Sequence, residues 1–246
     1  MLNNAEAVIL AGGRGTRLRS VVSDRPKVLA AVNGRPFLTY LLDQVAAAGI
    51  LNVILCVGYR GDQVQAAFGQ QYAGMHLIYS QETTPLGTGG ALCLACPLIT
   101  SNTFIAMNGD SFCNVNLKDL WEWHHTREAK ATIVLTHQPD STRYGRVSLS
   151  PEGIIMSFEE KGIATRAGWM NAGIYVFNSE MMRTVHGVTH AVSLERQIIP
   201  GWVGQRLYGY QSHGRFLDIG TPESYAQADT FFADKGKNES EAICGA

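Results

Sequence analysis

The sequence predicts an α/β protein built around a mixed, mostly parallel sheet with helices on both faces. Three short apolar runs, at residues 7–11, 53–57 and 104–107, each lead into a glycine-containing segment. Runs of this length that are apolar on both faces are typical of buried parallel strands. Helix-like segments separate the runs, and strand–helix–strand units of this kind build parallel sheets.

The other expected elements follow in chain order. Three helices separate these strands, at residues 37–48, 62–68 and 89–99. The second half alternates strand-like runs with turns, and its expected strands cover residues 131–137, 145–149, 154–158, 171–177 and 215–219. Residues 192–199 are expected to form a helix, and Pro222 at a first helical position opens a final helix that ends near residue 232.

Composition limits the class of protein. No internal repeat or low-complexity linker divides the 246 residues, so we expect one domain over residues 1–233 and a polar C-terminal tail over residues 234–246. Twenty Lys and Arg against 21 Asp and Glu give no basic excess, which disfavours nucleic acid as a partner. No apolar run reaches the roughly 18 residues of a membrane helix, no export signal is present, and the five cysteines are an odd number. We therefore expect a cytoplasmic protein with reduced thiols and no membrane partner.

The sharpest local signal is a glycine-rich loop directly after the first strand, Leu10-Ala11-Gly12-Gly13-Arg14-Gly15-Thr16-Arg17-Leu18. Three glycines in four residues let the backbone turn tightly and present N–H groups to an anion. Arg17 adds a planar guanidinium suited to phosphate. The loop lacks the lysine of a Walker A motif, and Leu18 stands where a dinucleotide-binding fingerprint needs its third glycine. It predicts a phosphate site at the carboxyl end of a strand.

Other segments would complete that site. Lys27, after a proline, is a second cation for the same phosphates. Small residues around Gly87 open a helix whose first N–H groups can meet a flat or anionic ligand. Asn108 and Asp110 end a buried strand, and Asp218 lies in a turn near the C-terminus. Two carboxylates beside triphosphate oxygens are ligands that Mg²⁺ takes, although each Asp alone is more often a turn or cap residue.

Together these residues resemble the signature of the sugar-nucleotidyltransferases, also called nucleotide-sugar pyrophosphorylases. The signature is G-G-x-G-T-R-L at residues 12–18 with Pro26-Lys27, and the resemblance covers about residues 5–232. Within the family, the chain is most similar to the guanylyltransferases that act on D-glycero-α-D-manno-heptose 1-phosphate. That similarity rests on residues 85–91, 143–147, 157–161, 171–175 and 216–220.

The resemblance implies a Rossmann-like nucleotide-diphospho-sugar transferase fold and an enzyme whose partners are GTP and a sugar 1-phosphate. The sugar phosphate would attack the α-phosphorus in line, with Mg²⁺ as cofactor, and release pyrophosphate. A mannose-1-phosphate guanylyltransferase, a uridylyl- or thymidylyltransferase and a non-catalytic nucleotide-sugar-binding regulator stay open as alternatives. A glycosyltransferase would usually carry Asp-x-Asp, which this chain lacks. The chain could form a homodimer.

The resemblance also implies roles for individual residues. Arg17, Lys27 and Asp110 would be catalytic, and Asp110 with Asp218 would hold Mg²⁺. Lys161 would bind the sugar phosphate, with Glu160, Asn171 and Gly145 on the sugar. The nucleotide-binding residues would be Leu10, Ala11, Gly12, Gly13, Gly15, Thr16, Arg17, Gln81, Glu82, Gly87, Thr88 and Asn108, with Gln81 or Glu82 facing the base.

Several suggestive residues are interpreted as structural. Cys93 and Cys96 form a C-x-x-C, but they lie in an apolar helical stretch and no second pair completes a zinc site. His124-His125 has no third ligand at metal spacing, so we expect an ordinary helix-end pair. Trp169, just before a strand, is either a lid that faces the sugar or a packing residue.

Overall fold

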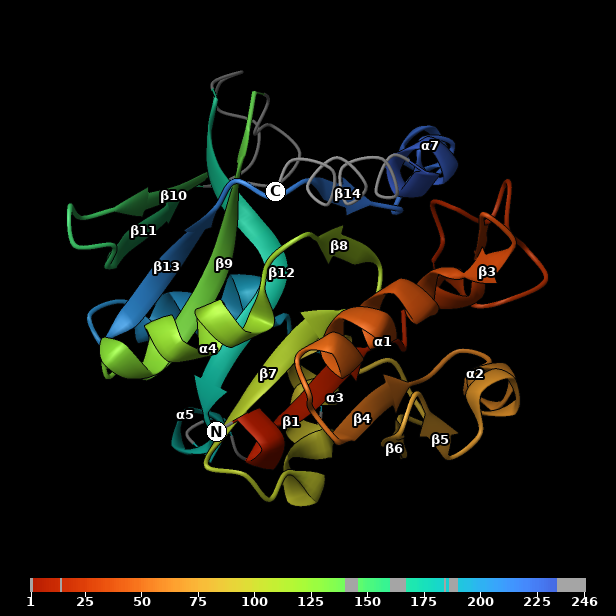
Figure 1. Cartoon of the computed structure of the whole chain (residues 1–246), viewed down its shortest axis with the longest axis horizontal. Coiled ribbons are helices and arrows are strands. Elements are labelled where there is room, and N and C mark those ends of the chain that lie inside the picture. The colour runs from red at the N-terminus through yellow and green to blue at the C-terminus, as the bar shows by residue number, and fades with distance from the viewer. Residues whose placement is uncertain are drawn as a thin grey trace, which may run out of the picture.

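Eight strands form the central sheet of the protein, which a computed structural model describes for residues 2–13, 15–139, 146–159, 167–183, 185 and 190–233 (Figure 1). In spatial order the strands are β13 (Leu207–Ser212), β9 (Ala131–Gln138), β12 (Gly168–Asn178), β7 (Thr103–Asn108), β1 (Glu6–Leu10), β4 (Asn52–Val57), β6 (Met75–Gln81) and β5 (Gln71–Tyr72). β12 runs antiparallel to both neighbours and β5 antiparallel to β6, whereas the other pairs are parallel. The expected mixed, mostly parallel sheet is confirmed.

Three two-stranded sheets and the helices complete the described fold. The small sheets pair β2 (Ala31–Val32) with β3 (Arg35–Pro36), β8 (Ser111–Cys113) with β14 (Phe216–Asp218), and β10 (Arg146–Leu149) with β11 (Ile155–Glu159). The α-helices are α1 (Phe37–Ala47), α2 (Gly61–Phe68), α3 (Gly87–Ala95), α4 (Leu117–Thr126), α5 (Ser179–Arg183), α6 (Pro222–Tyr225) and α7 (Ala228–Ala233). None of the helices in the described ranges has the length and apolarity to cross a bilayer.

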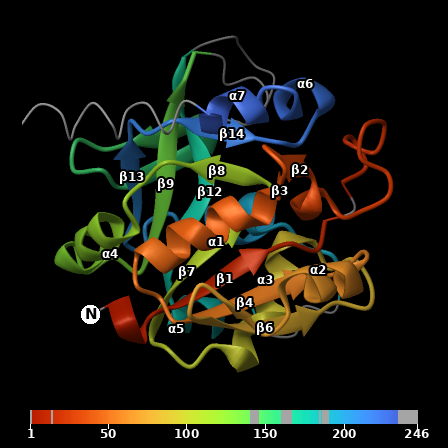
Figure 2. The same cartoon turned by 45° about the vertical axis from the view of Figure 1, so that its right-hand side comes forward.

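Alternating side chains on the strands divide the core between the two faces of the sheet. In β1, Ala7 and Ile9 pack into a cluster that includes residues of α1, α4 and α7, whereas Val8 packs into a second cluster with α3 and α5. Figure 2 shows α1 crossing the face of the sheet that is turned to the viewer. The expected helices on both faces are therefore confirmed, because β1 is buried from both sides.

Some elements differ from the sequence-based expectation. The helix expected over 89–99 begins at Gly87 and ends at Ala95, and a 3₁₀ helix, Cys96–Leu98, follows because Pro97 has no N–H to continue the helical ladder. The expected final helix is two short helices, α6 and α7. They are separated where Gln227 N donates to Ser224 O, a tighter i→i+3 bond.

The helix expected over 192–199 is also wrong in type. Residues Leu194–Ile198 form a π-helix, and Ile199–Trp202 form a 3₁₀ helix. Val192 stays outside the helix because its N–H donates to Leu86 O and its carbonyl accepts from Gly89 N, so contacts with the start of α3 hold it. These hydrogen bonds join segments that are far apart in the chain, so the local sequence pattern could not predict them.

Strands β6 and β13 were not expected, and α4 was expected only at its C-terminal end, where His124-His125 were interpreted as a helix-end pair. β13 is an edge strand, and β6 is covered on its outer side only by the two-residue β5. Buried and more exposed residues therefore alternate along much of both strands, and neither strand is a continuous apolar run. The strand expected over 145–149 is β10, which begins at Arg146; residue 145 lies outside the described residues.

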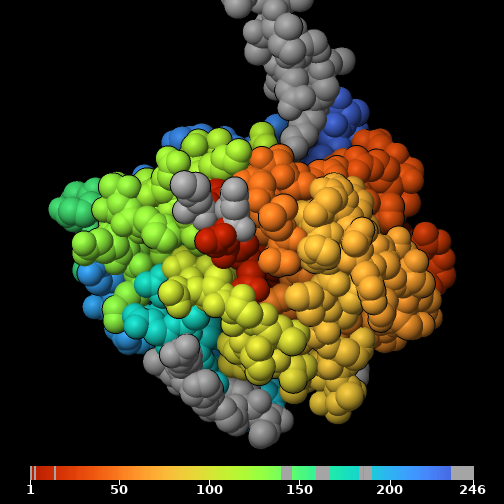
Figure 3. All heavy atoms as spheres, turned by 60° about the horizontal axis from the view of Figure 1, so that its bottom comes forward, coloured from red at the N-terminus to blue at the C-terminus, as the bar shows by residue number. Residues whose placement is uncertain are grey.

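The amino-terminal edge of the sheet is closed. The N-terminal segment, red in the space-filling view of Figure 3, lies between the orange early part and the yellow-green middle part of the chain. Glu6, only 5% exposed, accepts hydrogen bonds from the backbone N–H groups of Thr100 and Ser101 at 2.7 and 2.8 Å. A carboxylate satisfied in this way is a structural cap, and the opposite, carboxyl edge is where a ligand site is expected.

His124 is a buried neutral histidine within α4. Its Nε2 lies 3.2 Å from Asn178 Oδ1, which can only accept, so Nε2 carries the proton and Nδ1 accepts from the Thr132 hydroxyl at 2.8 Å. Burial lowers the pKa of His124 from 6.5 to about 4. The pair His124-His125 is thus structural.

This lowered pKa predicts a pH-dependent stability. The folded pKa lies below the unfolded one, so the contribution of neutral His124 is complete above pH 6.5 and is lost as the pH falls towards 4. Between pH 7.5 and 5 the free energy of unfolding should fall by about 2 kcal/mol through this residue alone. Urea unfolding of wild type, His124→Gln and the exposed-neighbour control His125→Gln measures the slopes. Parallel pH slopes for wild type and His124→Gln would contradict the assignment.

The C-x-x-C is also structural. The Cys93 thiol donates to Val185 O at 3.6 Å and the Cys96 thiol to Leu92 O at 3.3 Å, and both cysteines are free. Burial raises the pKa of Cys93 and raises that of Cys96 to about 11. Both thiols are therefore protonated near neutral pH and are used in hydrogen bonds within the protein.

Candidate active site

The glycine-rich loop leaves β1 at the carboxyl edge of the sheet. Its first residue, Ala11, donates to Cys56 O of β4 at 2.8 Å, and Gly109 N after β7 donates to Leu10 O at 3.0 Å. A Cβ added to Gly109 would lie 2.7 Å from Leu10 O, so only glycine allows this approach. The loop and the Asn108-Gly109-Asp110 segment therefore lie side by side.

Within the loop, Gly15 has a φ of +56°, which favours glycine, and its backbone packs on the stem of Lys27: an added Cβ would lie 3.2 Å from Lys27 Cβ. An added Cβ on Gly13 would meet nothing within 4 Å. Thr16 and Arg17 are exposed, and Arg17 forms no hydrogen bond or ion pair with the residues that the structure describes. Backbone and guanidinium are thus accessible to an anion.

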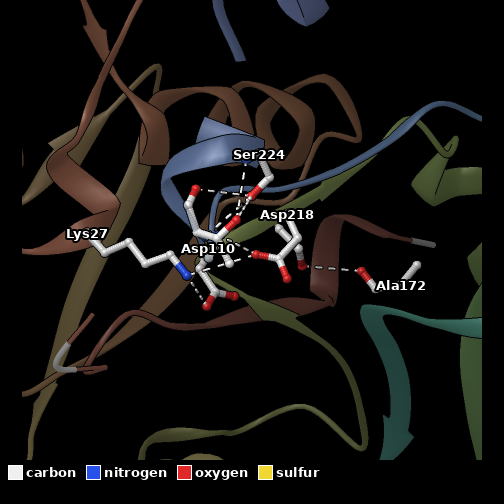
Figure 4. A network of polar contacts seen from close by, with 8 residues as sticks. Lys27, Asp110, Ala172, Asp218 and Ser224 are labelled. Atoms are coloured by element: carbon white, nitrogen blue, oxygen red, sulfur yellow. Dashed lines mark hydrogen bonds and ion pairs between the residues drawn. The ribbon is translucent and has the colours of Figure 1, made fainter. Parts of the chain in front are cut away.

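Lys27, Asp110 and Asp218 meet beside this loop (Figure 4). The Lys27 Nζ lies 2.7 Å from Asp110 Oδ2 and 4.0 Å from Asp218 Oδ1. The lysine side chain is 10% exposed, whereas Asp110 is 46% and Asp218 19% exposed. The three residues that the sequence predicted for the phosphates and the metal are therefore brought together, and their carboxylates can be reached from solvent.

The pairing of β8 with β14 brings Asp218 close to Asp110. It sets Asp218 opposite Ser111, and Ile219 N donates to Asp110 O at 3.0 Å. The Asp218 carboxylate accepts from Gly220 N, and the following turn ends in a capping box between Thr221 and Ser224 (Figure 4). Backbone hydrogen bonds thus hold both aspartates in place from segments distant in sequence.

The two aspartates suit a divalent cation that also binds substrate. Among the described residues, no group of three or more His, Cys, Asp or Glu side chains could hold a metal. Mg²⁺ is usually held by one or two carboxylates, with phosphate oxygens and water as its other ligands. Asp110 and Asp218 could supply the carboxylate ligands, and a triphosphate would supply many of the remaining oxygen ligands.

Gln81 and Glu82, expected near the base, differ in their surroundings: Gln81 is the last residue of β6, and Glu82 follows it. The Glu82 carboxylate accepts from Leu86 N at 3.0 Å, and a Cβ added to Gly12 would lie 2.9 Å from its Oε1. Burial raises the pKa of Glu82, and the Leu86 N–H opposes this in part. Gln81 is exposed and donates to Gly58 O at 3.3 Å. Glu82 therefore lies against the glycine loop, with Gln81 more exposed beside it.

The start of α3 packs against the segment before the π-helix. Gly87 has a φ of +70°, and an added Cβ would lie 2.5 Å from Val192 O, so glycine is required there. Gly89 N donates to that same oxygen at 2.9 Å. Thr88 donates to Glu195 Oε2 at 2.7 Å. The N–H group of Gly89, which we expected to be open to a ligand, is thus bonded within the protein. Thr88 belongs to a cluster of polar side chains that includes Glu195.

That polar cluster lies at the carboxyl edge between α3, β12 and the π-helix. The Tyr175 hydroxyl donates to Glu195 Oε1 at 3.2 Å and accepts from Asn171 Nδ2 at 2.9 Å. Tyr175 is fully buried, and burial together with Glu195 raises its pKa well above 10. Asn108 Oδ1, at the end of β7, is buried without a hydrogen-bond partner among the described residues.

Sequence reasoning predicted Thr88, Asn108 and Asn171 but missed Tyr175 and Glu195. The available signal was weak: a tyrosine within the apolar run 174–177 and an acid within an expected helix. Gly145, Glu160 and Lys161 lie outside the described residues, so their roles stay predictions. Trp169 is half-buried, with its ring edge-on to His137 and His213 at 5.4 and 5.7 Å, and it lines a cleft of about 520 Å³ with Arg146 and Gln211.

One edge of an open α/β sheet thus carries backbone amides, two cations and two carboxylates. Groups of this kind can bind phosphates and stabilise the charge that develops during nucleotidyl transfer. Comparison with known proteins agrees. The nucleotidyl transferase family matches residues 6–235, and the chain belongs to this family. It is a nucleotidyltransferase of the nucleotide-diphospho-sugar transferase fold.

Individual relatives refine the comparison. D-glycero-α-D-manno-heptose 1-phosphate guanylyltransferase of Aneurinibacillus thermoaerophilus is 35% identical over 91% of this chain and 96% of the relative. Mannose-1-phosphate guanylyltransferase of Mycobacterium tuberculosis is 34% identical over 92% of this chain, which spans only 64% of that enzyme. The crystal structure of HddC from Yersinia pseudotuberculosis complexed with GMP-PN superposes with a TM-score of 0.81 at 30% identity, over 93% of this chain and 99% of that one.

Proposed function

We propose that this protein joins GTP and D-glycero-α-D-manno-heptose 1-phosphate to give GDP-heptose and pyrophosphate. The observation that carries the reaction class is the meeting of Lys27, Asp110 and Asp218 beside the glycine loop. The choice of substrates is supported by similarity to a heptose 1-phosphate guanylyltransferase along 96% of that enzyme's length. A mannose-1-phosphate guanylyltransferase is the second candidate, favoured by the nearly equal identity of 34% to such an enzyme.

The proposed chemistry needs no protein nucleophile, because the sugar phosphate is already an anion. The difficulty is to bring two polyanions together and to stabilise charge on the equatorial oxygens of the α-phosphate. Arg17 and Lys27 would bind these oxygens, and Lys161 would bind the sugar phosphate. Mg²⁺ held by Asp110 and Asp218 would supply further neutralising charge.

We also propose that the polar cluster receives the sugar. Glu195 and Asn171 present polar groups at the edge of the sheet, and Asn108 Oδ1 needs a donor. Sugar hydroxyls donate and accept hydrogen bonds, so a hydroxyl could satisfy such an atom. Glu160 and Gly145, expected on the sugar, would belong to the same subsite.

The proposed preference for guanine rests on the position of Glu82. Guanine presents an N1–H and an N2–H₂ donor edge, which a carboxylate can accept in bidentate fashion. Uracil and thymine offer one donor between two acceptors and suit Gln81 better. The Glu82 carboxylate beside Gly12 is compatible with guanine. A site that pairs its polar groups with one base rejects others, because mismatched groups are left unpaired.

Pyrophosphate release tests the substrates directly. GTP, UTP, dTTP and ATP are each combined with the heptose 1-phosphate and with mannose 1-phosphate, and we expect the highest rate for GTP with the heptose. A faster reaction with UTP or dTTP would refute the guanine assignment. Equal or faster use of mannose 1-phosphate would refute the heptose assignment and leave the reaction class intact.

A further inference from the structure

We propose that Lys27 competes with the divalent cation for Asp110 and Asp218, so that the cation binds tightly only when a triphosphate draws the lysine away. The inference rests on the proposed role of the two aspartates as cation ligands. It adds that the same lysine which serves the phosphates also holds the carboxylates when no phosphate is bound.

The position of the ammonium group is the first argument. Lys27 Nζ lies 2.7 Å from the Asp110 carboxylate and 4.0 Å from that of Asp218, so one ammonium group is close to both. No side chain separates it from the turn after Asp218, since a Cβ added to Gly220 would lie 3.3 Å from Nζ and 2.6 Å from Asp218 Oδ1. A cation bound to both carboxylates at roughly 2.1 Å would need the same space.

Charge is the second argument. An ammonium group and a divalent cation repel each other at these distances, and at 10% exposure of the lysine side chain solvent screens them poorly. The stem of Lys27 is fixed near Cβ by the backbone of Gly15, but the remaining methylenes are flexible enough to move the ammonium group. Either the lysine or the cation can therefore lie between the carboxylates.

A triphosphate would resolve the competition in favour of the cation. It offers the ammonium group new anionic partners beside the glycine loop. It also offers the cation phosphate oxygens as ligands, and among the described residues no third acidic, histidine or cysteine side chain forms a metal-binding group with the two aspartates. Nucleotide and cation should therefore bind cooperatively, with Lys27 as the residue that couples them.

The test is Mn²⁺ binding, measured by electron paramagnetic resonance on the nucleotide-free protein. Lys27→Met removes the charge and keeps the length, and we expect it to bind Mn²⁺ at least about tenfold more tightly than wild type. Lys27→Arg keeps the charge and should bind like wild type, as should Lys118→Met, which removes an exposed lysine of α4. Adding Asp110→Asn to Lys27→Met should abolish the gain. Circular dichroism checks that each variant is folded.

A Lys27→Met protein that binds Mn²⁺ no more tightly than wild type would overturn the proposal. A gain that persists with Asp110→Asn would do the same, because the ion would then lie elsewhere. A non-hydrolysable GTP analogue should increase the Mn²⁺ affinity of wild type more than that of Lys27→Met, and equal increases would also count against it. Failure of the proposed function is separate: it would appear as no pyrophosphate release with any substrate pair, whatever the Mn²⁺ affinities.

Discussion

Asp110→Asn and Asp218→Asn are each expected to lower the turnover of GTP and sugar 1-phosphate by at least about 100-fold, the scale of losing a charge-stabilising group. Both carboxylates lie near Lys27 Nζ, with Asp110 at 2.7 Å and Asp218 at 4.0 Å. Asparagine keeps the size of the side chain and removes the charge that a divalent cation needs. The reduced affinity for the cation would slow the reaction.

Pyrophosphate release at saturating Mg²⁺ measures this effect, with Asp119→Asn on the exposed surface of α4 as the matched control. The control should turn over like wild type. A near-normal rate in either Asp110→Asn or Asp218→Asn would show that the pair does not hold the catalytic cation.

Glu195→Gln is expected to lower kcat/KM for the sugar 1-phosphate about 50-fold, the cost of losing a hydrogen bond to a charged group. Glu195 accepts from Thr88, Tyr175 and Ser193, so it organises the polar cluster proposed for the sugar. Glutamine keeps the shape but cannot accept at both ends. Affinity for GTP, measured by calorimetry, should change little.

Two comparisons make this result specific. Glu122→Gln, exposed on α4, should behave like wild type. Tyr175→Phe removes a single hydroxyl from the same cluster and should have a smaller effect on the sugar. An equal loss of GTP affinity and sugar affinity in Glu195→Gln would point to a general disturbance of α3 and would contradict a sugar subsite.

Much of the fold could be predicted, because a strand that is buried on both faces appears in the sequence as a continuous apolar run. β1, β4 and β7 are continuous apolar runs, since each is covered by helices on both sides, and each was expected. β6 and β13 were not predicted, because these strands at or near the edge of the sheet are buried largely at alternate residues and lack a continuous apolar run. Val192 was expected in a helix, but its hydrogen bonds to Leu86 and Gly89 are tertiary contacts that local propensity does not encode.

For the candidate site, the sequence alone identified the glycine-rich loop and the charged residues that we propose for the phosphates and the cation. Gly15 has a φ of +56° and packs against the side chain of Lys27, which favours glycine at this position. A local preference of this kind can be recognised from the type and spacing of residues in the sequence. Only the tertiary structure decided the partners. Lys27 contacts Asp110 across 83 positions, the pairing of β8 with β14 adds Asp218, and Glu195 reaches Tyr175 because the π-helix packs on α3. Contacts of this kind depend on how distant segments are placed in space, and no local pattern of residues specifies that placement.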